Sequence, residues 1–129
     1  MKNAVTSRDA PAAIGPYSQA VRAGDLLFLS GQIPLDPTTG AMVGGDIAAQ
    51  TERVMTNLGA VLAAAGCGFG DVVRSTIYVV DLADYSKINE VYGRFFAEPY
   101  PARSTVQVSA LPRGARVEVE AIAVLRPAP

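Results

Sequence analysis

The sequence predicts a single α+β domain in which two helices cover one face of a mixed β-sheet. Three observations support this prediction: two segments have helical spacing, β-branched runs alternate with them, and two strands with period-2 alternation close the chain. Strand–helix–strand crossovers are right-handed, so both helices are expected on the same face of the sheet. With 129 residues, 50% of them hydrophobic, the chain is expected to form one domain over residues 1–129.

The first part of the chain is predicted to be a loop followed by a buried strand. Residues 10–20 carry two prolines and a glycine, which favours an ordered loop, and Tyr17 is its one aromatic residue. The apolar run at residues 26–29 has the length of a strand and ends in Ser30 and Gly31. A glycine just past a strand end either lets a ligand approach the backbone or makes a β-bulge, and both interpretations stay open.

Two helices and a central strand follow. Asp46 is placed to cap the first helix and Gly66 to end it, and between them apolar residues recur on one helical face. Residues 72–80 are rich in β-branched side chains, which predicts a central strand. A second helix is predicted from about residue 84 until Pro99 forbids its continuation. Its apolar stripe consists of Tyr85, Ile88, Tyr92, Phe95 and Phe96, with Asn89 on the flank.

The last segment places charged side chains in a predicted β-hairpin. Strands at 104–110 and 116–125 alternate polar with apolar residues, and residues 111–114 supply the turn. Arg103 sits at the mouth of the first strand, and both glutamates of the second strand share one face. A guanidinium and a carboxylate are therefore expected to meet on neighbouring strands. The pattern does not choose between a structural ion pair and a functional site.

The other face of the sheet is expected to lack helices. Val80, Ile122 and Val124 would place apolar area there. Large exposed apolar patches usually find a partner, so the sequence predicts a homo-oligomer built on this face.

The composition excludes several kinds of chemistry. The chain has no histidine and one cysteine, Cys67, which removes His-dependent nucleophile pairs and most zinc sites and rules out an intrachain disulfide. No phosphate loop, dinucleotide fingerprint or metal-ligand spacing occurs, so the expected site uses neither a cofactor nor a metal.

Charge and hydropathy bear on the partners and the compartment. A net charge of -1 and a pI near 5.3 argue against nucleic acid as the main partner. Residues 1–10 contain no continuous apolar stretch, and no later segment is apolar over a membrane-spanning length. A cytoplasmic protein that does not enter a membrane is expected.

Several stretches together resemble the RidA (YjgF) family of reactive-intermediate and imine deaminases. They are residues 13–20, 29–34, 46–66 and 76–81, Asn89, residues 101–104 and residues 117–124. The resemblance implies a chorismate-mutase-like homotrimer with ligand sites in the clefts between subunits. It implies cofactor-free hydrolysis of 2-imino acids, such as 2-iminopropanoate and 2-iminobutanoate, and of their enamine tautomers. The products are 2-oxo acids and ammonia, and the reaction removes the imines before they damage other enzymes.

The resemblance also implies roles for residues. Arg103 would clamp the substrate carboxylate, because a planar guanidinium offers two parallel donors. Glu118 matches the position that orients or activates the attacking water; Glu120 points the same way by parity, and only the resemblance favours Glu118. The implied substrate-binding residues are Tyr17, Ser30, Gly31 through its backbone, Asn89 and Thr105. Many members carry cysteine at the last of these positions, so the threonine leaves the subfamily and the substrate preference open.

Two other functions remain as alternatives. An endoribonuclease or translation inhibitor is one, although the chain lacks a histidine for chemistry on a 2′-hydroxyl. A non-catalytic module that binds carboxylate metabolites is the other, with Arg103 holding the ligand without turnover.

Overall fold

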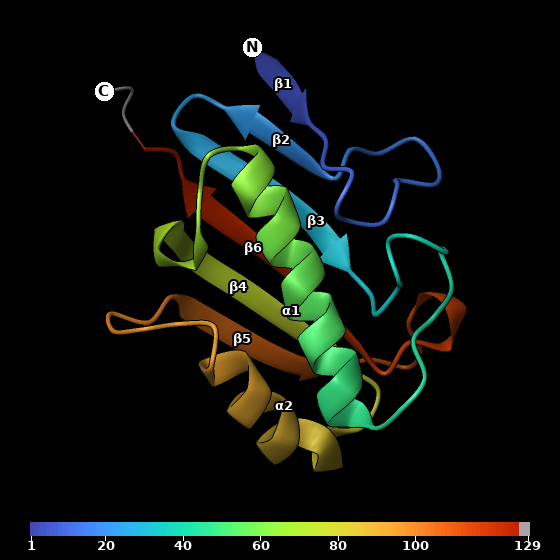
Figure 1. The fold of residues 1–129 in the computed structure, drawn as a ribbon. Helices are drawn as coiled ribbons and strands as arrows, with labels where there is room; N and C mark the ends of the chain where they lie inside the picture. Colours follow the sequence, from blue (N-terminus) through green and yellow to red (C-terminus); the bar gives the residue numbers. More distant parts are fainter. Residues whose placement is uncertain (127–129) are drawn as a thin grey trace.

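The computed structural model describes residues 1–126 and contains a six-stranded mixed sheet with two α-helices packed on one face (Figure 1). The strands are β1 (Lys2–Val5), β2 (Ala20–Ala23), β3 (Leu26–Gln32), β4 (Val72–Val79), β5 (Ala102–Gln107) and β6 (Val117–Val124), and the helices are α1 (Ile47–Ala64) and α2 (Tyr85–Gly93). Their order in the sheet is β1-β2-β3-β6-β4-β5, with β4 and β5 parallel and the other neighbours antiparallel. The predicted α+β class is confirmed.

Both predicted helices form, and their ends follow the local sequence. The Asp46 carboxylate accepts a hydrogen bond from the Ala49 N–H at 2.9 Å, and Gly66 adopts a φ of +76° just past the end of α1. Helix α2 ends at Gly93, earlier than predicted. Phe95 and Phe96 therefore lie beyond the helix, where both rings pack on Phe69 with centroids 5.3 Å apart.

The prediction of a hairpin between the last two strands is wrong. Strand β5 pairs with β4 in parallel, and β4 lies between β5 and β6. The physical reason is the crossover through α2, which carries the chain from the end of β4 to a parallel neighbour, β5, at the edge of the sheet. Residues 108–116 then pass across the end of β4 to start β6 on its other side.

Two short strands were absent from the sequence-based prediction. β1 and β2 have four residues each and form the edge of the sheet beyond β3. Their pairing depends on β3, which joins β2 through a turn with Gly24 at a φ of +60°. Such short segments carry too little alternation to be recognised before their partner is known.

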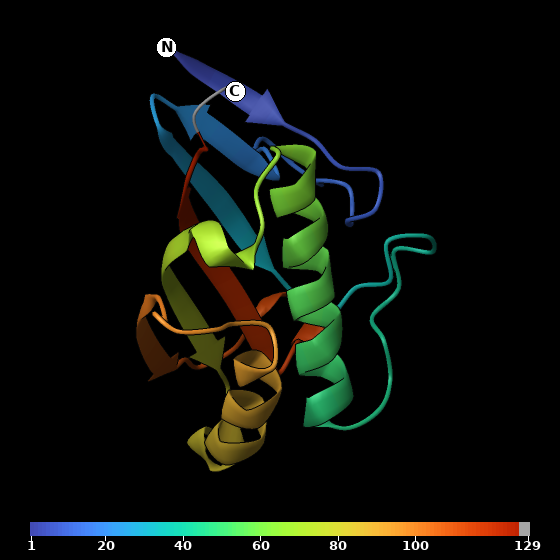
Figure 2. The same ribbon diagram turned by 60° about the vertical axis from the view of Figure 1, so that its left-hand side comes forward.

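The two faces of the sheet differ as predicted. Alternate residues of β6, beginning with Val117, are buried beneath the helices, whereas Ile122 and Val124 point to the face without helices. Figure 2 shows both helices on one side of the sheet. We call the latter the helix-free face. Large apolar residues exposed on it are Leu26, Phe28, Val106 and Val124, each 38% to 42% exposed. Val80 follows directly after β4.

Candidate functional site

Arg103 lines a pocket of about 330 Å³ on the helix-covered side of the sheet. We call it the Arg103 pocket; its other lining residues are Asn89, Tyr92 and Gly93 of α2 together with Tyr100 and Pro101. The Arg103 guanidinium donates to the Tyr85 hydroxyl at 2.8 Å and stacks on two rings, with its central carbon 4.9 Å from the Tyr92 centroid and 5.7 Å from that of Tyr85. Two tyrosines of α2 therefore fix the arginine.

Tyr92, which contacts Arg103, is itself held by a hydrogen bond in the core. The hydroxyls of Tyr92 and Ser75 share a hydrogen bond of 2.6 Å, and burial raises the pKa of Tyr92, so this phenol stays neutral. Arg103 forms no ion pair with any carboxylate of residues 1–126. An arginine that is held in place and has no carboxylate partner among these residues keeps donors available for an anionic ligand.

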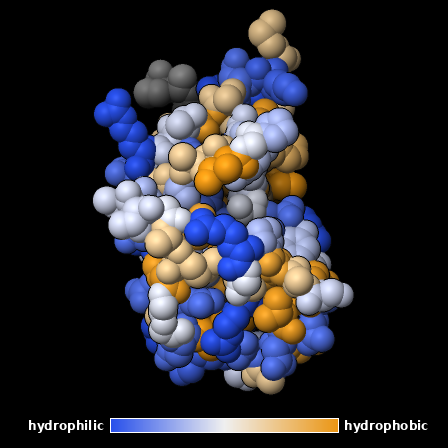
Figure 3. Space-filling model, turned by 90° about the vertical axis from the view of Figure 1, so that its right-hand side faces the viewer, coloured by the Kyte–Doolittle hydropathy of each residue, from blue (hydrophilic) through white to orange (hydrophobic). Residues whose placement is uncertain are grey.

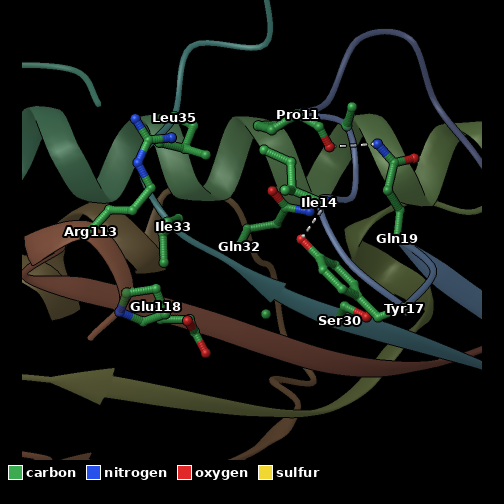
Figure 4. A pocket seen from close by; sticks show the side chains of 13 residues that line it. Pro11, Ile14, Tyr17, Gln19, Ser30, Gln32, Ile33, Leu35, Arg113 and Glu118 are labelled. Carbon is green, nitrogen blue, oxygen red and sulfur yellow. Dashed lines mark hydrogen bonds between the residues drawn. The ribbon is translucent and has the colours of Figure 1, made fainter. Parts of the chain in front are cut away.

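Glu118 lines a second and larger pocket, of about 490 Å³, at the end of β3 (Figure 4). We call it the Glu118 pocket. It contains three further predicted site residues, Tyr17, Ser30 and Gly31. Its other lining residues are Pro11, Ala12, Ile14, Gln19, Gln32, Ile33, Leu35, Pro112 and Arg113. Figure 4 shows Glu118 extending from β6 and Ser30 from β3, with Tyr17 on the loop beyond.

The Glu118 carboxyl group is suited to proton transfer. Its pKa is raised above the usual carboxyl value, first by burial and second by the negative charge of Glu120. A carboxylate with a raised pKa is a stronger base than an exposed one, because its proton affinity lies closer to neutral pH.

A β-bulge at the end of β3 makes room for this carboxylate. Leu29 pairs with Ala121 and Gln32 with Val119, so β3 carries one residue more than β6 between the two pairs. A Cβ atom on Gly31 would lie 2.5 Å from Oε2 of Glu118, closer than real Cβ contacts. Gly31 therefore lies in a β-bulge, and the missing side chain leaves room for the Glu118 carboxylate; the approach of a ligand to its backbone stays a prediction.

Glu120 has a different environment from Glu118. The Tyr78 hydroxyl donates to Oε1 of Glu120 at 2.7 Å, and this hydrogen bond is the main cause of a raised pKa of Tyr78. Glu120 lines only a small cavity of about 30 Å³ between β4 and β6. The alternation of the strand makes the two glutamates equivalent in the sequence, but their contacts in the structure differ.

The predicted site residues fall into two groups within one subunit. Arg103 and Asn89 share the Arg103 pocket, whereas Tyr17, Ser30, Gly31 and Glu118 share the Glu118 pocket. Arg103 faces the helices and Glu118 the helix-free face, so the expected contact between them on neighbouring strands does not form within a subunit. Thr105 lines neither pocket, and its buried hydroxyl has no hydrogen-bond partner among residues 1–126.

Sequence reasoning missed residues that the geometry places beside the predicted ones. Tyr85 and Tyr92 were interpreted as core residues of an apolar stripe, although their spacing of seven also places both over one neighbour. Arg113 belongs to the predicted turn at residues 111–114, to which no site role was given, yet it lines the Glu118 pocket with a φ of +58°. No signal in the sequence reveals that loops 6–19 and 33–46 line the same pocket.

The other candidate groups give no second site. Among residues 1–126, no three His, Cys, Asp or Glu side chains cluster as metal ligands do, and no helix there is long and apolar enough to cross a membrane. The Cys67 thiol is buried, and burial is the main cause of its raised pKa, as expected for a packed thiol.

Comparison with known proteins decides the family. The family model described as Endoribonuclease L-PSP, to which the RidA (YjgF) proteins belong, matches residues 7–125. The chain is a member of the RidA family. Protein DfrA of Myxococcus xanthus is 63% identical over 125 residues, 95% of each chain. The 2-iminobutanoate/2-iminopropanoate deaminase of Bos taurus is 46% identical over 127 residues, which cover 98% of this chain and 93% of the relative.

Solved RidA family structures have the same fold. RidA from an Antarctic Psychrobacter has a TM-score of 0.91 at 43% identity, covering 95% of this chain and 99% of that one. TdcF of Escherichia coli with bound serine also has a TM-score of 0.91 at 43% identity, covering 96% and 99%. The bound serine shows that TdcF accepts a small amino-acid ligand.

Proposed function

We propose that this protein hydrolyses 2-imino acids and their enamine tautomers to 2-oxo acids and ammonia, at sites that two subunits of a homotrimer build together. Relatives named as deaminases support the reaction. The observation that carries the proposal is that Arg103 and Glu118 line two separate open pockets. Arg103 has no ion-pair partner among residues 1–126, and the carboxyl pKa of Glu118 is raised. Packing of the exposed apolar helix-free face between subunits would place the edge strand β5, which carries Arg103, beside the Glu118 pocket of the neighbouring subunit.

The chemistry follows from the two side chains. Arg103 holds the substrate carboxylate with parallel N–H donors and thereby fixes the imine carbon. Glu118 takes a proton from a water molecule as the water oxygen bonds to that carbon. The substrate enters as the protonated iminium, so this addition gives a carbinolamine with an amine nitrogen. Glu118 returns its proton to that nitrogen, the C–N bond breaks to release ammonia, and Glu118 takes the hydroxyl proton as the C=O bond forms. Substrate and one water are thus converted to a 2-oxo acid and ammonia, with no electron transfer.

The experiment that tests this proposal generates the imine during the assay. A pyridoxal-phosphate-dependent threonine dehydratase releases 2-iminobutanoate, and 2-oxobutanoate formation is followed with and without this protein. We expect acceleration over the uncatalysed rate, because general acid–base positioning alone contributes about 10²- to 10⁴-fold. A correctly folded protein that leaves the rate unchanged would instead favour the carboxylate-binding alternative.

The ribonuclease alternative has less support from the geometry. Arg116 is paired with Asp84 at 3.0 Å and Arg126 with Asp71 at 2.9 Å, while Arg113 donates to the carbonyl of Gly40 at 2.9 Å. These three arginines near the end of the chain are thus engaged within the subunit. Salt-dependent RNA binding accompanied by cleavage would restore this alternative.

The raised pKa of Glu118 predicts how the reaction rate depends on pH. A general base works in its ionised form, so kcat/KM is expected to rise with pH through the pKa of Glu118, which lies above the usual carboxyl value. Glu120→Gln removes a neighbouring negative charge and is expected to move this limb to lower pH. Measurements over roughly pH 4 to 8, corrected for the uncatalysed reaction, check the shift. A limb that stays in place in the variant would contradict the coupling of the two glutamates.

Gly31 provides a steric prediction. Gly31→Ala places a Cβ where Oε2 of Glu118 now lies, so the carboxylate must move and kcat/KM is expected to fall about 10- to 100-fold. The thermal stability should change little, because the group that must yield is the end of a flexible side chain. Gly44→Ala is the matched control, since a Cβ at Gly44 meets nothing within 4 Å. An unchanged rate in Gly31→Ala would show that the position of Glu118 does not limit the reaction.

A further inference from the structure

One loop joins the end of β3 to helix α1 and also borders the Glu118 pocket. It spans residues 33–46, and its Ile33 and Leu35 line the pocket (Figure 4). In Figure 1 the loop runs along the outer side of α1, with no α-helix or strand beyond it. Figure 3 faces this side of the molecule, where hydrophilic and hydrophobic side chains mix at the surface. The position of the loop therefore depends on the contacts of its inner side.

Hydrogen bonds within the loop tie its two arms together. The Val43 N–H donates to the carbonyl of Pro34 at 2.8 Å, and Leu35 and Met42 form an antiparallel β-bridge. The loop is thus a small hairpin with its own backbone pairing. An anchor on one arm consequently positions the other arm as well.

Asn57 of α1 is the anchor on the inner side. Its side chain is fully buried, and Nδ2 donates to the carbonyl of Leu35 at 2.9 Å and, over a longer distance of 3.5 Å, to the carbonyl of Ile33. Both N–H groups of the amide therefore serve two residues that line the Glu118 pocket, although Asn57 itself does not line it. Because a buried amide is costly unless its hydrogen bonds are made, these contacts favour one position of the loop.

Arg53 determines which way round the Asn57 amide lies. Its Nε donates to Oδ1 of Asn57 at 3.0 Å. A guanidinium carries no acceptor, so only the oxygen of the amide can face it, and the NH₂ group must face the two carbonyls. The contacts therefore run from the half-buried Arg53 through Asn57 to the lining of the Glu118 pocket.

The anchored carbonyls directly follow the bulge that accommodates Glu118. Ile33 comes after Gln32, the last residue of β3, and the bulge lies between Leu29 and Gln32. An extra residue in a strand loosens the pairing locally, so hydrogen bonds just beyond it help to fix the register. The same anchor holds Ile33 and Leu35 at the pocket, where apolar side chains limit the water that reaches the carboxyl group.

We propose that Asn57 is a positioning residue for the deamination: through the backbone of Ile33 and Leu35 it fixes the pocket lining and thereby Glu118, and Arg53 orients its amide. This inference rests on the proposed function and adds two residues of α1 that do not touch the substrate. The competing explanation is that Asn57 only stabilises the fold. Both explanations predict a lower Tm when Asn57 is truncated, so the deciding measurement must report on Glu118 itself.

The test follows the titration of the Glu118 carboxyl group by NMR, with isotope-labelled carboxyl carbons and Glu118→Gln to assign the signal. In Asn57→Ala the pocket lining is released, more water reaches Glu118, and its pKa should fall toward the usual carboxyl value. The charged groups beside Glu118 are Glu120 on the same strand and Arg113 in the pocket lining, and this variant changes neither. We expect kcat for 2-iminobutanoate to fall about 10-fold and KM to change less than about 3-fold, because Arg103 still holds the substrate.

Thr51→Ala is the matched control. Thr51 is a fully buried polar residue of the same helix, but its hydroxyl donates to the carbonyl of Ile47 within α1 at 2.7 Å, and it lines neither pocket. This variant should lower Tm as Asn57→Ala does. It should leave the Glu118 titration and kcat unchanged.

Arg53→Met is a second variant that spares the core. It keeps an apolar stem at a half-buried position but loses the donor to Asn57, so the amide is no longer held in one orientation. The Glu118 titration should shift in the same direction as in Asn57→Ala, by a smaller amount. Arg53→Lys retains a donor and should lie between Arg53→Met and the wild type.

The outcomes separate this inference from the proposed function. An unchanged Glu118 titration in Asn57→Ala and Arg53→Met overturns the inference, as does an equal shift in Thr51→Ala, and Arg53→Met decides alone if Asn57→Ala does not fold. A shifted titration with unchanged kcat removes the role in the reaction. The titration needs no substrate, so a shift together with no imine hydrolysis by the wild type overturns the proposed function and leaves the positioning of Glu118 by Asn57 standing.

Discussion

Replacing Arg103 with alanine is expected to lower kcat/KM for 2-iminobutanoate about 10²- to 10⁴-fold. Each hydrogen bond to a charged group contributes about 1.5 to 3 kcal/mol, and the guanidinium offers two such bonds to one carboxylate. Tyr85 and Tyr92 remain in place to hold the emptied pocket, so the loss should come from binding and orientation rather than from unfolding. Steady-state rates, with circular dichroism to verify folding, provide the measurement.

Two further substitutions test the geometry of the arginine. Arg103→Lys keeps the charge but loses the planar fork, so an intermediate loss of about 10-fold is expected. Arg94→Ala removes a surface arginine that pairs only with exposed Glu90, and it should leave the rate within about 2-fold of wild type. If Arg103→Ala behaves like Arg94→Ala, Arg103 does not contact the substrate.

Replacing Glu118 with glutamine is expected to lower kcat about 10²- to 10⁴-fold, which is the usual contribution of a positioned general acid–base group. The glutamine keeps the size of the side chain but cannot take a proton from water. KM should change less than kcat, because the carboxylate of the substrate is held by Arg103. The pH-dependent limb attributed to Glu118 should disappear in the same variant.

Glu120→Gln is the matched control for Glu118→Gln. It changes the neighbouring glutamate on the same face of β6, whose carboxylate accepts from Tyr78 rather than lining the Glu118 pocket. A loss below about 10-fold is expected, together with the shift of the pH limb described above. Equal losses in the two variants would contradict the assignment of the water-activating role to Glu118.

Much of the fold could be predicted from the sequence because its signals are local. Asp46 and Gly66 mark the ends of α1, and the β-branched run at residues 72–80 marks β4. The order of the strands is a different matter, since alternation shows which face a residue occupies but not which strand it pairs with. The contact expected between Arg103 and Glu118 failed for this reason, because β4 intervenes and the two side chains face opposite sides.

The candidate site was predictable only in part, for related reasons. Tyr85 and Tyr92 have the helical spacing of core residues, and only the position of β5 shows that they hold Arg103. Glu118 and Glu120 are equivalent by periodicity, and the hydrogen bond from Tyr78, a residue about 40 positions earlier, separates them. The Glu118 pocket combines two loops and a turn that share no sequence pattern. Long-range contacts of this kind depend on the completed fold.

Mixed trimers test the central claim most directly. Arg103→Ala and Glu118→Gln subunits are combined by co-expression at equal levels and purified through two different tags. If each site of a homotrimer takes Arg103 from one subunit and Glu118 from its neighbour, one of the three sites in every mixed trimer regains both residues, and activity on 2-iminobutanoate should return to about one third of wild type. Mixed trimers no more active than either parent variant would contradict a site shared between subunits.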